Sequence, residues 1–347
     1  MWSIGCLAGG LSPETGRRRL PARIALRTAA ALLAAGALSV AQAQVSFHVG
    51  FDDPGADFAR YYGSIGRSIR AAGAEWAQYL DTGARAVLQV QVSFEDIATA
   101  STGSVTNWYL GQYNGYSLYE QGATHEVRTG LDPNGKEPDI HIAIGSNGYL
   151  QNELWFDPSP SRQRMEVPLD RTDARSLFVH ELGHAFGFNG WRDGVTGELP
   201  GGYASTFDVW VSPQIVEGQS VLAFTGPSAT ALYGGPVPLT VGSYAHLGNP
   251  APLPGSDLIP DLMNGVAFTR GTRYHITPLD LAMLRDLEST LPSGVADLTG
   301  GLRAAPMLEA PPPLAVPEPS TWLLMVAGLA LAATGRRRLR SRLSRSG

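Results

Sequence analysis

The residues best suited to chemistry in this chain of 347 residues are His180, Glu181 and His184, in the run RSLFVHELGHAFGF. Histidines four positions apart lie one above the other on one face of a helix, about 6 Å apart, so both imidazoles can reach one metal ion. Glu181 would lie beside the open coordination position, where its carboxylate can take a proton from zinc-bound water. The spacing therefore indicates the chemistry of a zinc hydrolase.

The same run predicts the helix that must position these side chains. Gly187 is the expected helix stop, because glycine readily adopts the left-handed conformation of a C-cap. The five-residue pattern alone also occurs by chance on ordinary amphipathic helices, so the flanking residues decide between the two interpretations. Helix-forming residues surround the motif: Ala174, Leu177, Phe178, Val179, Leu182, Ala185 and Phe186.

A third protein ligand has to come from further along the chain. Position 190, three residues after Gly187, is a glycine and has no side chain that could bind metal. Of the remaining histidines, His246 in the loop VGSYAHLGNP is the best candidate. The others are expected in an N-terminal strand (His48), a polar loop (His125), an alternating strand (His141) and just before the last helix, where His275 is a weaker candidate ligand.

A tight turn, Asp261-Leu262-Met263-Asn264-Gly265, follows His246 in the sequence. Asn264 and Gly265 supply the turn chemistry, since both residue types tolerate positive φ. The segment ITPLDLAMLRDLEST then predicts a helix, with Thr277 as its N-cap and Pro278 in its first position. Its expected apolar stripe consists of Leu279, Ala282, Met283 and Leu287.

This order of elements resembles the leishmanolysin-like metzincins, in which HExxHxxG is followed by an insertion before the third histidine. It resembles still more a group of bacterial surface proteins that combine a related metallopeptidase domain with a sorting tail. The resemblance spans residues 172–291 and is carried by the segments HELGHAFGF, TFDVWV, AFTGPSATALYGGPVPL, GSYAHLG and DLMNG.

The resemblance implies that His180, His184 and His246 bind Zn²⁺, that Glu181 is the general base, and that Met263 forms the turn beneath the metal. The chain departs from the pattern in two places. The turn ends in a glycine where proline is more usual, and no tyrosine follows Met263 at two residues. The additional tyrosine ligand of some metzincins is therefore absent.

The expected fold class is α+β and metzincin-like, with a twisted N-terminal sheet packed on two helices, an active-site cleft and a loop-rich C-terminal lobe. The metallopeptidase domain is assigned to residues 44–291, divided into subdomains 44–189 and 190–291. A helix is expected within 56–80, strands within 84–96 and 138–145, a long surface excursion at 98–137, and loops at 190–275.

The N-terminal 43 residues have the pattern of a secretory signal peptide. Arg23 and Arg27 precede an uncharged run at 28–40, which ends in the small-residue sequence Ala41-Gln42-Ala43. Basic, apolar and small-residue regions in this order predict cleavage after Ala43. The n-region is unusually long, unless translation starts downstream of Met1.

Residues 316–347 resemble the PEP-CTERM sorting signal of Gram-negative bacteria, which implies recognition by an exosortase. A Pro-Glu-Pro box is followed by WLLMVAGLALAAT and an arginine cluster. About 14 apolar residues reach roughly 21 Å, short of the ~30 Å hydrocarbon core, so a transient anchor is expected rather than a permanent one. Residues 292–315 are expected to be a Pro-rich linker. A plain transmembrane anchor is the alternative.

The composition of the segment between the two terminal signals indicates an exported, soluble domain. Between the two terminal signals, 15 basic residues face 29 acidic residues, a net charge of about −14, which argues against nucleic acid as a partner. The single cysteine, Cys6, lies in the predicted signal segment, so a metal would have to be bound by His, Asp or Glu. A monomer with a protein or peptide substrate is expected.

The sequence thus predicts an exported zinc-dependent endopeptidase located at the cell surface or in the extracellular matrix. Two alternatives remain open. One is a non-catalytic zinc-containing surface protein with a metallopeptidase-like fold, although a structural zinc site needs no base such as Glu181. The other is a gluzincin-type peptidase with Glu198 or Glu217 as a ligand, although neither residue lies in a clear second helix.

Overall fold

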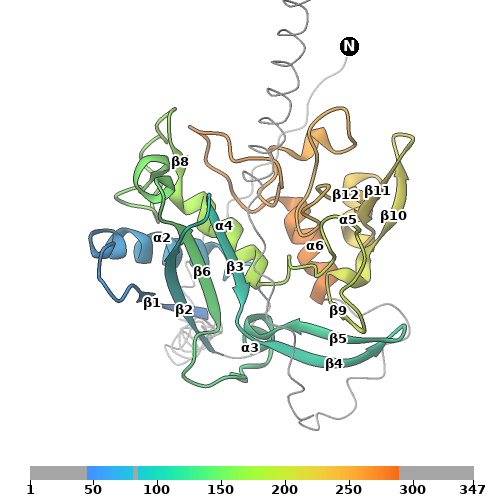
Figure 1. The fold of residues 1–347 in the computed structure, drawn as a ribbon, viewed down its shortest axis with the longest axis horizontal. Coiled ribbons are helices and arrows are strands. Elements are labelled where there is room, and N and C mark those ends of the chain that lie inside the picture. Colours follow the sequence, from blue (N-terminus) through green and yellow to red (C-terminus); the bar gives the residue numbers. More distant parts are fainter. Residues whose placement is uncertain (1–44, 81–84, 289–347) are drawn as a thin grey trace, which may run out of the picture. The chain divides into compact units, whose positions relative to one another are not determined.

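The computed structural model describes residues 45–80 and 85–288, which combine several small sheets with few helices (Figure 1). The predicted α+β class is confirmed at this level. The expected signal peptide at 1–43, the linker at 292–315, and the sorting tail at 316–347 with its short apolar segment all lie outside the described residues.

The main sheet has four strands in the order β1-β2-β6-β3. Strands β1, β2 and β6 are parallel, and β3 is antiparallel to β6. Buried and partly exposed residues alternate along β2, as the apolar period of two predicts. The two predicted strands are therefore confirmed. The bounds are Val45–Asp52 for β1, Ala86–Glu95 for β2, Ala100–Ser104 for β3 and Ile140–Gly145 for β6.

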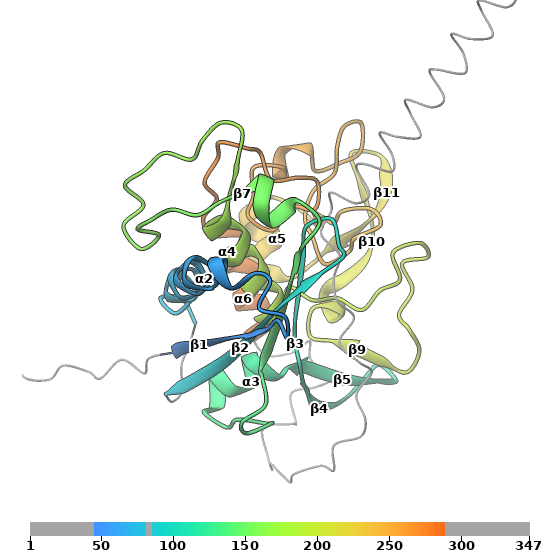
Figure 2. The same cartoon turned by 60° about the vertical axis from the view of Figure 1, so that its left-hand side comes forward.

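Two helices pack on this sheet and on each other: α2, Tyr62–Trp76, and α4, Ala174–Ala185. Helix α2 lies against β1 and α4, and α4 lies against β3 (Figure 2). The indole nitrogen of Trp76 donates a hydrogen bond of 2.7 Å to the carbonyl oxygen of Val179, which fixes the two helices side by side. Both predicted helices are confirmed, α2 being shorter than the predicted segment and preceded by a 3₁₀ turn at Ala59–Tyr61.

The prediction of a surface excursion at 98–137 is wrong. This segment forms β3 at the sheet edge, the hairpin of β4 (Asn107–Tyr113) and β5 (Tyr116–Gln121), and helix α3 (Gly122–Thr129). Its many Gly, Tyr, Asn and Thr residues favour loops, but Thr and Tyr also favour strands. Asn114 and Gly115 both have positive φ, which is the two-residue hairpin turn that Asn-Gly predicts.

The second half of the chain is rich in loops, as predicted, but also holds a three-stranded antiparallel sheet of β10, β11 and β12. Helix α5 packs on the last helix, α6. Thr277 and Asp280 form a reciprocal capping box, with N···O distances of 2.7 and 3.1 Å, so the predicted start of α6 is confirmed. The bounds are Val211–Val216, Gln219–Phe224 and Val237–Pro238 for the strands, Pro227–Tyr233 for α5 and Pro278–Glu288 for α6.

The remaining elements are short. Strand β9 extends the β4–β5 hairpin through parallel pairing with β5, and β7 pairs with β8. Within 45–80 and 85–288, no helix has the length and apolar character needed to span a bilayer. The bounds are Leu154–Trp155 for β7, Thr172–Asp173 for β8, Tyr203–Ser205 for β9, Tyr149–Glu153 for a π turn, and Asp208–Trp210 and Ser256–Leu258 for 3₁₀ turns.

Candidate metal centre

Helix α4 carries the histidine motif through the interior of the molecule, and all twelve of its residues are buried. Asp173 caps its N-terminus, because the carboxylate accepts hydrogen bonds from the amide (3.1 Å) and hydroxyl (2.7 Å) of Ser176. Gly187 has a φ of +121° just beyond the C-terminus, which confirms it as the helix stop. The helix is therefore fixed at both ends.

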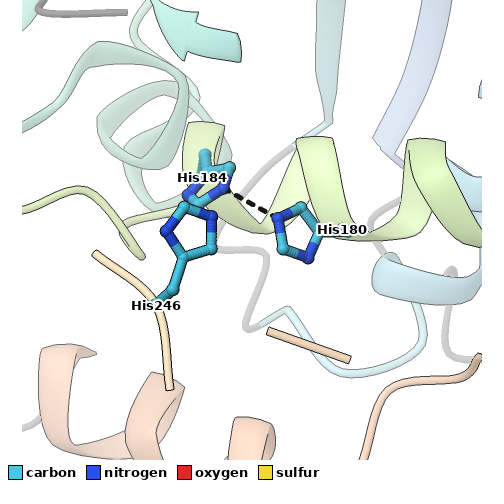
Figure 3. Close-up of side chains that lie close together, drawn as sticks. All are labelled: His180, His184 and His246. Atoms are coloured by element: carbon cyan, nitrogen blue, oxygen red, sulfur yellow. Dashed lines mark hydrogen bonds between the residues drawn. The ribbon is translucent and has the colours of Figure 1, made fainter. Parts of the chain in front are cut away.

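Three histidines converge at this helix (Figure 3). His180 and His184 come from α4, with their Nε2 atoms 3.0 Å apart. His246 comes from a separate loop, and its ring centroid lies 5.2 Å from that of His180 and 4.7 Å from that of His184. All three side chains are completely buried. The structure therefore brings together the three residues that the sequence predicted as ligands.

The hydrogen bonds of the rings fix which nitrogen carries a proton. The Nδ1 atom of His180 lies 2.7 Å from the carbonyl oxygen of Leu262, and that of His184 lies 2.6 Å from the carbonyl oxygen of Phe188. A carbonyl oxygen only accepts, so both Nδ1 atoms are protonated and donate. Each neutral ring then has its lone pair on Nε2, the nitrogen that faces the other ring.

This donor set fits a divalent transition metal. Ligand atoms of the three histidines all lie within 4.8 Å of one another. Tetrahedral Zn–N bonds of about 2.0–2.1 Å place neighbouring nitrogens about 3.3 Å apart, close to the 3.0 Å between His180 and His184. A contact this short between two ring nitrogens fits either a hydrogen bond, in which one ring carries both protons, or a metal ion bound by both nitrogens. His180, His184 and His246 thus form a group that could hold such a metal ion.

A turn that contains Met263 packs directly against the motif. Asp261 accepts a hydrogen bond of 3.0 Å from the amide of Met263, and Asn264 donates one of 2.8 Å to the carbonyl oxygen of Asp261. A Cβ atom at Gly183 would lie 2.7 Å from the sulfur of Met263. The methionine therefore lies against α4 at Gly183, the residue before His184, and the glycine leaves room for it.

The same turn holds the loop of His246. The amide of Leu247 donates to the carbonyl oxygen of Met263 at 2.8 Å, and the amide of Gly265 donates to that of Leu247 at 2.9 Å. The hydroxyl of Ser243 lies 2.8 Å from Nδ1 of His246, so the ring is oriented from its own loop. Backbone hydrogen bonds therefore join the His246 loop and the Met263 turn into one unit.

We expect Gly265→Ala to disturb this unit. The added Cβ would lie 2.2 Å from the hydroxyl of Thr240 and 2.7 Å from Cβ of His246, so the His246 loop must move. The free energy of unfolding should fall by about 1–3 kcal/mol, measured by chemical denaturation. Gly202→Ala is the matched control, because a Cβ there meets nothing within 4 Å. Equal stabilities for the two variants would contradict the expectation.

Glu181 belongs to the same turn of helix and is completely buried. At about 100° per residue, its Cβ is displaced about 100° around the helix axis from His180 and about 60° from His184. This position borders the face that carries the two histidines. The carboxylate therefore lies in the same helical turn as the two histidines, next to the face that carries them.

His125 is not in a polar loop, and that prediction is wrong. It lies on α3 with 1% of its surface exposed, stacked on Trp108 at 4.0 Å between ring centroids. Its Nδ1 atom lies 2.7 Å from the carboxylate of Glu120, which also pairs with Arg128. His125 therefore serves the packing between α3 and the β4–β5 hairpin.

The other histidines also lie apart from the three. His48 is exposed on β1, and His141 on β6 pairs with Ser93 at 2.9 Å, as expected of strand residues. His275 precedes α6 and lies 3.3 Å from the carboxylate of Glu75. The structure does not place the second candidate ligand, His275, with His180 and His184.

Glu75 on α2 is a residue that the sequence did not single out. Its carboxylate pairs with Arg175 of α4 and accepts a hydrogen bond of 3.2 Å from the amide of Ile276. Burial acts to raise its pKa, but the bond from His275, the charge of Arg175 and the Ile276 amide together lower it. Glu75 therefore connects α2, α4 and the segment before α6 as an ionised carboxylate. No local sequence signal marks a contact between residues so far apart in the chain.

Gly190 is packed against the side chains of Asp208 and Phe207 and supplies no metal ligand. A Cβ at Gly190 would lie 3.1 Å from both the carboxylate of Asp208 and the ring of Phe207. Asp208 is buried and accepts hydrogen bonds of 3.1 and 3.2 Å from the amide of Trp191. The segment TFDVWV thus fixes the chain that leaves α4.

Neither glutamate of the gluzincin alternative lies with the histidines. Glu198 and Glu217 are exposed in loops and belong to no group of potential metal ligands among the described residues. The predicted active-site cleft stays a prediction. A cavity of about 830 Å³ is lined by Tyr244 and Arg192, but by none of the three histidines.

The comparisons with known proteins concern the tail. Residues 315–340 match the PEP-CTERM protein-sorting motif, so that part of the predicted resemblance is confirmed. The motif implies recognition of the C-terminal tail by an exosortase and points to export and sorting to the cell surface. No curated protein and no solved structure matches the chain.

Proposed function

We propose that this protein is an exported zinc-dependent endopeptidase with a metzincin-like centre. One observation carries the proposal: three buried imidazoles converge, and backbone carbonyls fix the tautomers of two of them so that Nε2 is the lone-pair donor. Neutral imidazoles are preferred zinc ligands, and three of them leave one position for water or substrate. The packing of Met263 against Gly183 and the positive φ of Gly187 at the helix end support a metzincin-like centre.

In this proposal each residue has a defined role. His180, His184 and His246 hold the metal, and Leu262, Phe188 and Ser243 orient their rings. Bound zinc supplies Lewis acidity and lowers the pKa of its water toward about 7. Glu181 accepts the proton of the attacking water and then delivers it to the amine of the departing peptide. Burial of Glu181 keeps its carboxylate away from competing solvent.

The terminal segments define where this activity would take place. The predicted signal peptide at 1–43 directs export, and the tail carries the sorting motif at 315–340. We place the enzyme at the cell surface or in the extracellular matrix of a Gram-negative bacterium, transiently anchored through its tail and acting as a monomer on protein or peptide substrates.

The test combines metal analysis with digestion of an unfolded protein such as reduced casein by the full chain. We expect about one zinc per chain, and digestion that stops on zinc removal and resumes on zinc addition. Zinc without digestion would instead identify a non-catalytic surface protein with a metallopeptidase-like fold. A chain that binds no zinc would overturn both functions.

A further inference from the structure

A second group of potential ligands, distinct from the histidines, consists of Glu126, Asp132 and Asp139. Glu126 lies on α3, Asp139 immediately precedes β6, and Asp132 lies in the loop that joins these two elements (Figure 1). Carboxylate oxygens of the three residues lie within 4.8 Å of one another. Glu126 and Asp139 are 4% and 1% exposed, whereas Asp132 is open to solvent.

The two buried carboxylates are held by the main sheet. Glu126 accepts a hydrogen bond of 3.1 Å from the amide of Val87, and Asp139 accepts one of 2.7 Å from the amide of Gln89. These β2 amides lie just before the residues that pair with β6. One oxygen of each carboxylate therefore accepts a hydrogen bond from β2, and these bonds hold both side chains in place.

No donor from another residue reaches the second oxygen of each buried carboxylate, Oε2 of Glu126 and Oδ1 of Asp139, and the two groups can hydrogen-bond to each other only when one of them holds a proton. Within the described residues, no lysine or arginine forms an ion pair with any of the three carboxylates. A buried polar atom without a partner is costly, and adjacent buried carboxylates repel each other as well. Either a proton shared by the two carboxyl groups or a bound cation is therefore needed to satisfy this group.

Burial makes ionisation of the Glu126 and Asp139 carboxyl groups unfavourable. The pKa of Glu126 is raised to about 7 and that of Asp139 to about 6, mainly by burial, with the charge of the neighbouring carboxylates adding to the effect. A bound cation would remove this penalty. The side chain of Asp132 is held in its loop, because its Oδ1 accepts hydrogen bonds of 3.0 and 2.6 Å from the backbone amides of Asn134 and Gly135.

We propose that Glu126, Asp132 and Asp139 form a calcium-binding site that fastens α3 and its following loop to the main sheet at the start of β2 and β6. The donors are all oxygens, which the hard Ca²⁺ ion prefers over the nitrogen donors that suit zinc. Calcium accepts 6–8 oxygens in irregular geometry, so water can complete a shell that is open on the Asp132 side. The smaller Mg²⁺ demands near-octahedral ligands and fits this set less well.

The test measures the thermal midpoint and calcium binding of the full chain, stripped of divalent ions on a chelating resin and supplied with one equivalent of zinc. At about 100 times the dissociation constant, Ca²⁺ should raise the midpoint by about 5–10 °C. Titration calorimetry should give one calcium per chain, and Mg²⁺ at the same concentration should raise the midpoint less. No calcium-dependent shift in the parent chain would overturn the site.

Glu126→Gln is the decisive variant, because its amide can still accept from Val87 and can donate to Asp139. Without calcium it should be at least as stable as the parent, and calcium should no longer raise its midpoint. Glu137→Gln, in the same loop but exposed, is the matched control and should keep the full shift. His246→Ala should also keep it, which separates this site from the histidine centre. A full shift in Glu126→Gln would show that calcium binds elsewhere.

Discussion

Glu181→Gln is expected to retain zinc and to lose nearly all peptidase activity. Glutamine has the size of glutamate and fits the same buried position in α4, so the three imidazoles should remain in place. Its amide cannot accept the proton of the attacking water. General-base catalysis typically contributes about 10²–10⁴ in rate, so kcat should fall by that factor. Metal content and the rate of cleavage of a fluorogenic peptide, measured on the same preparation, check the result.

Glu198→Gln is the matched control for this experiment. It makes the same chemical change in an exposed loop, and it also removes the glutamate that a gluzincin-type centre would require. We expect unchanged zinc content and unchanged turnover. Unchanged turnover in Glu181→Gln would remove Glu181 from the role of base, and loss of zinc in Glu198→Gln would favour a glutamate ligand.

The positions of His180 and His184 could be predicted from sequence because they depend on the geometry of a single helix. The i, i+4 spacing of His180 and His184 fixes their common face once the helix forms, and Gly187 marks where that helix ends. The choice of His246 required a contact across a long insertion. It rested on a glycine-rich loop followed by the Met263 turn, and the structure brings that loop to α4.

The features that the sequence does not predict depend on tertiary contacts, or on residue types that occur in both loops and strands. The composition of segment 98–137 does not distinguish a surface loop from strands, because Gly, Tyr, Asn and Thr occur in both, although Asn114-Gly115 is a recognisable hairpin signal. The role of Glu75 as a link between α2, α4 and α6 has no local signature. The meeting of Glu126 with Asp139 likewise follows from sheet register, which the sequence alone does not specify.

His246→Ala is expected to weaken zinc binding more than any change outside the ligands. Loss of an outer-shell partner typically costs about 10–100-fold in metal affinity, so removal of a ligand itself should cost more than about 100-fold. The backbone hydrogen bonds that join the loop to the Met263 turn do not involve the imidazole, so the loop should keep its position. Competition with a chromogenic zinc chelator measures the affinity of parent and variant.

His275→Ala distinguishes a ligand from a structural histidine. His275 is half exposed and lies beside Glu75, so its loss should weaken the link between α2 and α6 but leave zinc affinity unchanged. If His275→Ala loses zinc and His246→Ala does not, the third ligand has been wrongly assigned. The ring-centroid distances of 4.7 and 5.2 Å from His246 to the two α4 histidines predict the opposite outcome, because one ion can then be reached by all three rings.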